Sequence, residues 1–237
     1  MLRLDRWLVT LGVGSRSEVQ KLVKKGGVKV NGLPVKDPGT QVDETTAALA
    51  VNGAPLDGRL TRHVMLHKPA GLLTAARDKK QPTVMDLLPG VYTSISCMPV
   101  GRLDKDTTGL LFLTTDGELN HRLLAPGRHV DKTYRAEVDG TLNEQHITTF
   151  AEGLHLSDFD AQPAKLEIIA PNVGRVTVHE GKFHQVKRMF SAVGCEVTKL
   201  HRETFGSLTL DPDLPEGEWR ELTEDELAAL YNDAQMG

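Results

Sequence analysis

Apolar side chains recur at helical spacing near the start of the chain. In residues 4–11 they return every three or four positions, which predicts a helix with one buried face. Ser15 followed by Glu18 is the sequence signature of a capping box, so a second helix is expected to begin there. The pair Gly26-Gly27 should end that helix, because glycine readily adopts the left-handed conformation that follows many helices.

Short alternating runs follow these helices. Residues 28–30 alternate as a strand does, and Asn31-Gly32 is typical of a two-residue hairpin turn. A second turn of this type lies at Asn52-Gly53, and apolar periodicity then weakens over residues 56–62. We therefore expect a small helix–helix–strand module and a larger domain, with the limits 1–60 and 61–237.

The remainder of the chain is richer in strands than in helices. Strand-like patterns are found at 64–67, 111–114, 133–138, 165–169 and 174–179. Helical spacing is found at 184–193, and Thr223 is a suitable N-cap for a last helix. Because these strands do not alternate with long helices, a doubly wound parallel sheet is not expected. The pattern predicts an α+β fold on a mostly antiparallel mixed sheet.

Composition changes this picture little. Hydrophobic residues make up 39% of the 237 positions and charged residues 25%, which is an ordinary globular balance. Apolar runs stay well short of the roughly 20 residues of a membrane helix, and the first residues do not resemble a signal peptide, so a cytoplasmic location is the default expectation. Cys97 and Cys195 suggest two buried thiols, because a zinc site normally needs four ligands.

The distribution of charge is more informative than the net charge of −4. Residues 1–36 contain eight basic and two acidic side chains, whereas residues 211–237 contain one basic and nine acidic ones. A local basic field attracts phosphates even on a mildly acidic protein. The N-terminal module is therefore expected to bind nucleic acid, with the candidate residues Arg3, Arg6, Arg16, Lys21 and Lys24.

One polar loop carries candidate catalytic groups. Asp104 lies between Gly101 and Gly109, and a hydrophobic strand begins directly afterwards. Functional groups concentrate on loops that a rigid strand supports, although an isolated loop aspartate more often hydrogen-bonds its own backbone. Asp106 lies two residues further on, so a hydrolase with paired carboxylates is one alternative.

Three further segments are candidates. Residues 180–190 crowd cations around an apolar stripe, which fits either a solvated helix face or a site where one cation pairs with a carboxylate and others hold phosphates. Lys68 ends a strand before a Pro-Gly bend, which alone is a simple turn. Tyr134 begins a strand, where an aromatic ring can pack in the core or stack on a base.

The order of these pieces resembles a known family. The N-terminal module resembles the alpha-L RNA-binding module shared with a small-subunit ribosomal protein. Four later segments resemble, in order and with suitable gaps, motifs of the RsuA family of ribosomal RNA pseudouridine synthases; they are residues 66–71 (LHKPAG), 101–110 (GRLDKDTTGL), 132–134 (KTY) and 181–189 (GKFHQVKRM). One departure is His67, where the family more often has asparagine, and we assign this position no chemistry.

The resemblance implies a reaction and roles for residues. Members of the family convert uridine in RNA to pseudouridine without a cofactor or metal, so neither is expected here. Asp104 would be the nucleophile, Tyr134 would stack on the uracil and is a candidate general base, and Lys187 would pair with Asp104 to keep it ionised. Arg102 would help to hold the flipped base out of the RNA. Further candidates for RNA contact are Lys68, Lys182 and Arg188.

The resemblance also implies a substrate. We expect the substrate to be ribosomal RNA or a ribosomal assembly intermediate, with the small-subunit RNA as the favoured target. We also expect the enzyme to be a monomer. The runner-up interpretation is a non-catalytic RNA-binding or ribosome-assembly protein. The set of Asp104, Tyr134 and Lys187 favours catalysis over that interpretation, because a pure binder needs no such set.

Overall fold

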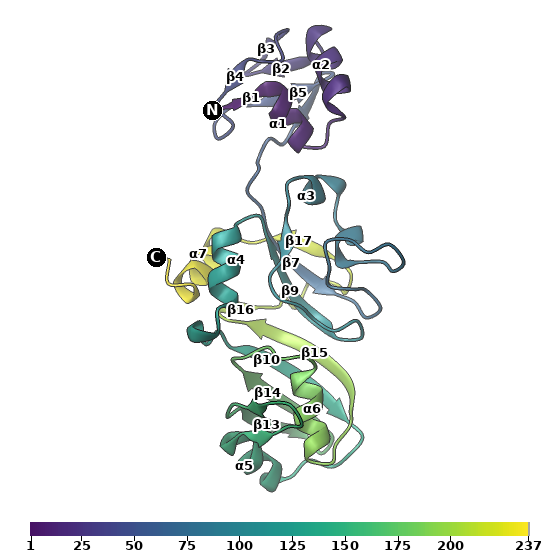
Figure 1. The fold of residues 1–237 in the computed structure, drawn as a ribbon, viewed down its shortest axis with the longest axis vertical. Coiled ribbons are helices and arrows are strands. Elements are labelled where there is room, and N and C mark those ends of the chain that lie inside the picture. The colour runs from purple at the N-terminus through teal and green to yellow at the C-terminus, as the bar shows by residue number, and fades with distance from the viewer. Residues whose placement is uncertain (237) are drawn as a thin grey trace. The chain divides into compact units, whose positions relative to one another are not determined.

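The computed structural model describes residues 1–236, which fold as two compact units (Figure 1). The first unit consists of Met1–Arg62 together with Leu88–Met98. The second consists of His63–Leu87 together with residues 99–236. No helix within these residues is long and apolar enough to cross a membrane.

The first unit packs two helices against small antiparallel sheets. The helices are α1 (Leu4–Thr10) and α2 (Arg16–Lys24), and the strands are β1 (Leu2–Arg3), β2 (Val28–Val30), β3 (Leu33–Pro34), β4 (Gln41–Val42), β5 (Leu49–Val51) and β6 (Ala54–Leu56). Strand β1 pairs with β4, and the other four have the order β3-β2-β5-β6. A short helix, α3 (Gly90–Ser94), also belongs to this unit.

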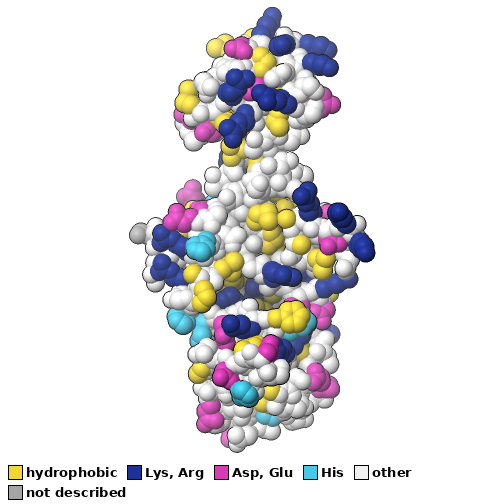
Figure 2. All heavy atoms as spheres, viewed as in Figure 1, with side chains coloured by type: hydrophobic (Ala, Val, Ile, Leu, Met, Phe, Trp, Pro, Cys, Tyr) yellow, Lys and Arg dark blue, Asp and Glu magenta, His cyan; other side chains and the backbone are white. Residues whose placement is uncertain are grey.

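Local sequence signals explain these elements. The side chains of Ser15 and Glu18 form the expected capping box at the start of α2. Asn31 has a φ of 50° and Gly32 a φ of 80°, the left-handed conformations that a type I′ hairpin turn requires. Trp7 is fully buried between the elements, and its indole N–H donates to the carbonyl of Gly58 (2.9 Å). Lys and Arg side chains gather on the face of this unit that Figure 2 shows.

The second unit is built on one mixed sheet. Its strand order is β13-β14-β10-β15-β9-β7-β17, and β16 pairs with β15. Only the pairing of β9 with β15 on this path is parallel, so the expected α+β fold on a mostly antiparallel sheet is confirmed. The strands are β7 (His63–Lys68), β9 (Thr108–Thr114), β10 (Lys132–Val138), β13 (Lys165–Ala170), β14 (Val173–Val178), β15 (Val197–Phe205), β16 (Leu208–Thr209) and β17 (Trp219–Glu221).

Helices cover two parts of this sheet. They are α4 (Gly117–Leu124), α5 (Glu144–Glu152), α6 (Gln185–Ala192) and α7 (Glu224–Asp233), with single turns at η1 (Val84–Leu87) and η2 (Pro126–Arg128). Leu119 of α4 and Leu230 of α7 share a core cluster with Phe112 of β9, and Figure 1 shows these two helices side by side. Helix α5 packs on β13, and helix α6 packs on β15. Phe150 of α5 and Phe190 of α6 contact each other, with ring centroids 5.0 Å apart. The remaining short strands are β8 (Met98–Pro99), β11 (Leu154–His155) and β12 (Asp160–Ala161).

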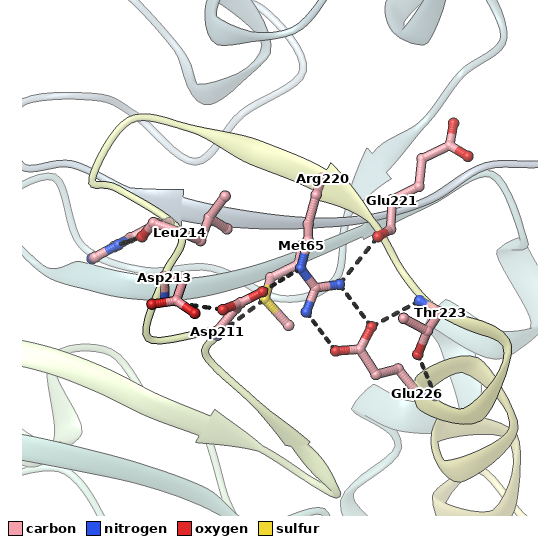
Figure 3. Close-up of polar contacts among 9 residues, drawn as sticks. Met65, Asp211, Asp213, Leu214, Arg220, Glu221, Thr223 and Glu226 are labelled. Atoms are coloured by element: carbon pink, nitrogen blue, oxygen red, sulfur yellow. Dashed lines mark hydrogen bonds and ion pairs between the residues drawn. The ribbon is translucent and has the colours of Figure 1, made fainter.

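An ion-pair cluster centred on Arg220 joins the edge strand β17 to its neighbours (Figure 3). Nε of Arg220 donates to Asp211 at 2.7 Å, and its two terminal nitrogens donate to the two oxygens of Glu226 at 2.8 and 2.6 Å. Hydrogen bonds to Arg220 lower the pKa of Glu226, whose own side chain also completes the capping box of Thr223 at the start of α7. One side chain thus fastens β17 to a helix and to the preceding loop.

Several elements were not predicted from the sequence. Helix α4 is one of them: Asp116 is its N-cap and accepts hydrogen bonds from the N–H groups of Glu118 and Leu119. Strand β15, of nine residues, buries Leu200, Arg202 and Phe205, and a register shift against β10 interrupts the alternation after Arg202. Cys97 and Cys195 are buried, as expected.

Candidate active site

The loop that carries Asp104 is fastened at its C-terminal end. The N–H of Thr107 donates to the carbonyl of Asp104 (3.1 Å), and the hydroxyl of Thr108 lies 2.8 Å from Nδ1 of His201 on β15. Gly109 pairs with β15 at a φ of +104°, and a Cβ at this position would overlap the backbone of that strand. A glycine is therefore required where the loop enters the sheet.

The buried side chain of Lys68 binds the backbone of the same loop. Its side chain is fully buried, and its ammonium donates to the carbonyls of Pro69 (2.9 Å), Lys105 (3.2 Å) and Thr107 (2.9 Å). Burial lowers the pKa of Lys68 to about 8. The expectation that Lys68 contacts RNA is corrected in this structure, because an amine enclosed by the loop backbone does not reach a phosphate.

Lys187 brings a cation to Asp104 from 83 residues further along the chain. Its Nζ lies 3.2 Å from Oδ2 of Asp104 and 2.6 Å from Oδ1 of Asp106. Asp104 and Lys187 are about three-quarters covered, whereas Asp106 is 75% exposed. The hydrogen bond from Lys187 lowers the pKa of Asp106. One ammonium group thus lies between two carboxylates, of which only Asp104 is sheltered from solvent.

His184 is a second cation candidate beside Asp104. Its Nε2 lies 3.5 Å from Oδ1 of Asp104, a contact that becomes an ion pair when the imidazole is protonated. His184 is the N-cap of α6 and has a left-handed φ of 50°. Such a conformation is uncommon for a residue with a side chain, so the surrounding contacts must hold it. The sequence pattern grouped His184 with other polar residues and gave it no role of its own.

Tyr134 faces the same pocket from the middle of the sheet. On β10 it is paired with Val176 of β14 and with Arg202 of β15, and its side chain is 9% exposed. Arg202 is in turn paired with Gly109, so the strand register aligns Tyr134 with the end of the Asp104 loop. The pocket is lined, among others, by Arg102, Asp104, Thr107, Tyr134, Lys182 and His184.

The other predicted cations of this unit differ in their freedom. Arg102 and Lys182 are exposed at the pocket. Arg188 is instead engaged within the protein: its guanidinium pairs with Asp158 and lies over the ring of Phe159 at 4.8 Å. Arg188 therefore has less freedom to reach a phosphate than the other two.

The N-terminal candidates are all exposed side chains of the first unit. Arg3, Arg6 and Arg16 line a shallow pocket with an apolar part at Val9. Arg3 donates two hydrogen bonds to the buried Asp5 (3.0 and 2.9 Å), and this bond lowers the pKa of Asp5 to about 2. Arg3, Arg6 and Arg16 thus form a basic surface at this pocket, and Lys21 and Lys24 on α2 are further exposed cations of the same unit.

Metal-ligating side chains are not gathered at either surface. Within residues 1–236, no group of three or more histidine, cysteine, aspartate or glutamate side chains is placed to hold a metal ion.

Comparison with protein families assigns both parts of the chain. A model described as RNA pseudouridylate synthase matches residues 62–192, more than half of the sequence, and the S4 domain model matches residues 2–46. The chain belongs to the RNA pseudouridylate synthase family. The resemblance inferred from the motifs is therefore confirmed, and the protein is an RNA pseudouridine synthase, an isomerase, with an RNA-binding S4 domain.

Individual relatives are similar in sequence to this synthase over nearly its full length. The Bacillus subtilis protein named uncharacterized RNA pseudouridine synthase YtzG is 44% identical, with 97% of this chain and 98% of that protein covered. Ribosomal small subunit pseudouridine synthase A of Pseudomonas aeruginosa is 41% identical, with 97% and 100% covered. A crystal structure of pseudouridylate synthase is 35% identical and superposes with a TM-score of 0.69 over 97% of this chain and 100% of the other.

Proposed function

We propose that the synthase modifies a uridine of small-subunit ribosomal RNA and that Asp104 is its catalytic carboxylate. The target is supported by the relative from Pseudomonas aeruginosa, which is named for the small subunit and is similar over its whole length. The role of Asp104 is supported above all by one observation: Lys187 holds this carboxylate at 3.2 Å beside a pocket that Tyr134 also lines.

The reaction moves the ribose from a ring nitrogen to a ring carbon of uracil, and no atom is gained or lost overall. A carboxylate can act as the nucleophile that opens this exchange when it is ionised and close to the substrate. Lys187 places its positive charge 3.2 Å from the carboxylate of Asp104. It is a single point charge rather than a two-pronged guanidinium, so it neutralises Asp104 without fixing both oxygens.

Tyr134 supplies the surface on which the uracil rests. The target base has to leave the RNA stack to enter the pocket, and lost stacking has to be replaced by side chains. The ring of Tyr134 offers that replacement, and its hydroxyl is the candidate base that takes a proton from the substrate. Arg102 is exposed at the same pocket and is positioned to hold the RNA open.

The first unit adds affinity that does not depend on the reacting base. Its basic surface at Arg3, Arg6, Arg16, Lys21 and Lys24 suits contacts to phosphates, which position a nucleic acid without reading its sequence. We infer that this surface holds the ribosomal RNA while the second unit acts on one uridine.

Replacing Asp104 tests the proposed site. Asp104→Asn keeps the size of the side chain and removes its charge, so pseudouridine formation should fall below detection while RNA binding persists. Asp225→Asn is the matched control, because it makes the same change at an exposed position in the first turn of α7 and should retain wild-type activity. The measurement is mapping of pseudouridines in transcribed small-subunit and large-subunit ribosomal RNA after incubation with each protein.

Two results would contradict the proposal separately. Normal turnover by Asp104→Asn would remove Asp104 from the chemistry. Pseudouridine found only in the large-subunit RNA would leave the site intact and overturn the proposed target.

A further inference from the structure

An exposed aromatic ring stands beside the proposed site. Phe183 lies in the turn between β14 and α6 and is 76% exposed, more than any other large hydrophobic side chain in the described part of the second unit. Exposing a phenyl ring to water gains nothing for folding, since its transfer from water is favourable only when it is covered. A role outside the folded core is therefore the better explanation for this ring.

The turn that presents Phe183 is fixed on both sides. Gln185 is buried, and its amide oxygen accepts a hydrogen bond from the N–H of Lys182 (3.1 Å) while its amide nitrogen donates to Glu180 (2.7 Å). The N–H of Gln185 also donates to the carbonyl of Lys182 (3.2 Å). A turn held in this way loses little conformational freedom when the ring that it carries binds a partner.

One face of the ring is already covered. The rings of Phe183 and His184 are stacked, with centroids 3.8 Å apart and an angle of 19° between their planes. His184 in turn reaches Asp104 at 3.5 Å. The stack thus places Phe183 one ring away from the proposed catalytic carboxylate and leaves its other face for a flat partner.

The surroundings of the ring indicate what that partner is. Its neighbours along the chain, Lys182 and His184, are polar, and Lys182 lines the pocket together with Arg102. An apolar protein surface would need a wider apolar patch than a single ring. A nucleobase needs only one flat ring for stacking and nearby cations for its phosphates.

We propose that Phe183 is a stacking platform for an unpaired base next to the target uridine in the RNA. This inference rests on the proposed site at Asp104. When the uridine leaves its stack, the neighbouring base loses a partner, and the open face of Phe183 replaces that partner. The platform therefore contributes to RNA affinity and to the choice of an unpaired target.

Substitutions at Phe183 test the platform by the kind of contact they retain. Stacking of a base on an aromatic ring is worth about a 5-fold to 150-fold change in affinity. Phe183→Ala should raise the KM by this factor for an RNA fragment that contains the target uridine. Phe183→Trp should restore the KM, whereas Phe183→Leu should not. The matched control is Ile169→Ala, which removes another exposed hydrophobic side chain, on β13, and should leave the KM unchanged.

An RNA that lacks one base identifies the partner. Fragments with an abasic site at each position flanking the modified uridine are compared on the wild type and on Phe183→Ala. At the stacked position, removing the base should raise the KM of the wild type by the same factor as Phe183→Ala does. The same abasic RNA should cause no further rise in the KM of Phe183→Ala.

Three results would overturn the platform. They are an unchanged KM for Phe183→Ala, equal restoration by leucine and tryptophan, and additive losses at every abasic position. Asp104→Asn is measured alongside to keep the two proposals apart. If Asp104→Asn is inactive and Phe183→Ala has no effect, the platform alone is refuted. If Asp104→Asn is active, the proposed site on which the platform rests is refuted.

Discussion

Lys68→Met should change how the stability of the second unit depends on pH. Methionine keeps the length of the lysine stem and removes the ammonium group that donates to the loop carbonyls of Lys105 and Thr107. The substitution therefore isolates the effect of one buried charge under the Asp104 loop.

The magnitude follows from the pKa of the buried amine. Burial lowers the pKa of Lys68 from 10.5 to about 8 in the folded protein, and each pH unit between these values is worth 1.36 kcal/mol. Below pH 8 the amine is protonated in both the folded and the unfolded protein. Between pH 8 and 10.5 the folded protein has released the proton and the unfolded protein has not, so the free energy of unfolding rises with pH, by about 3 kcal/mol in total. Methionine binds no proton, so the variant lacks this rise.

Urea unfolding at pH 7.5 and pH 9.5 measures the difference. The transition of the second unit can be followed by the fluorescence of Trp219 in a Trp7→Phe background, because Trp7 lies in the first unit. The free energy of unfolding of the wild type relative to Lys68→Met should increase by about 2 kcal/mol between the two pH values.

Two further lysines serve as controls. Lys132→Met should show a similar increase, because burial also lowers the pKa of Lys132 to about 8. Lys105→Met should show none, because Lys105 is exposed in the same loop as Asp104. A constant difference between the wild type and Lys68→Met at both pH values, with the increase present for Lys132→Met, would refute the burial of a charged amine at Lys68.

Two other predictions concern the edge of the sheet and the first unit. Arg220→Met leaves Asp211 and Glu226 without their cation and should lower the free energy of unfolding by about 1–3 kcal/mol in urea titrations, since the cluster is partly exposed. An unchanged value would contradict the cluster's role in holding β17. Arg6→Gln with Arg16→Gln should reduce the slope of log affinity against log salt by up to about 2, measured by RNA binding at several salt concentrations; an unchanged slope would remove both arginines from phosphate contact.

The sequence alone determined most local structure and the family. The capping box at Ser15, the N-cap at Thr223 and the turn at Asn31-Gly32 appear in the structure as predicted, because each depends on the backbone and side chains of a few adjacent residues. The motif around Asp104 was sufficient for the resemblance only because other motifs preceded and followed it in order. Read alone, this aspartate had no feature that distinguished it from a structural one.

Only the tertiary structure decided which side chains meet. The contact of Lys187 with Asp104 and the alignment of Tyr134 with the Asp104 loop depend on the packing of α6 and on the register of β10, β15 and β9. Strand register and helix packing join residues that are far apart in sequence, and no short window encodes them. The resemblance implied the Lys187 contact, but the residue pattern left it open.

Burial and exposure were the other properties that sequence could not supply. Lys68 and Lys182 have the same side chain, yet the fold encloses the first beneath a loop and leaves the second at the pocket. Phe183 belongs to an apolar residue type that usually lies inside, and the fold keeps it outside, stacked on His184. The sequence therefore determined which chemical groups the synthase possesses, and the tertiary structure decided which of them support the loop and which face the substrate, because water is excluded only where distant segments pack together.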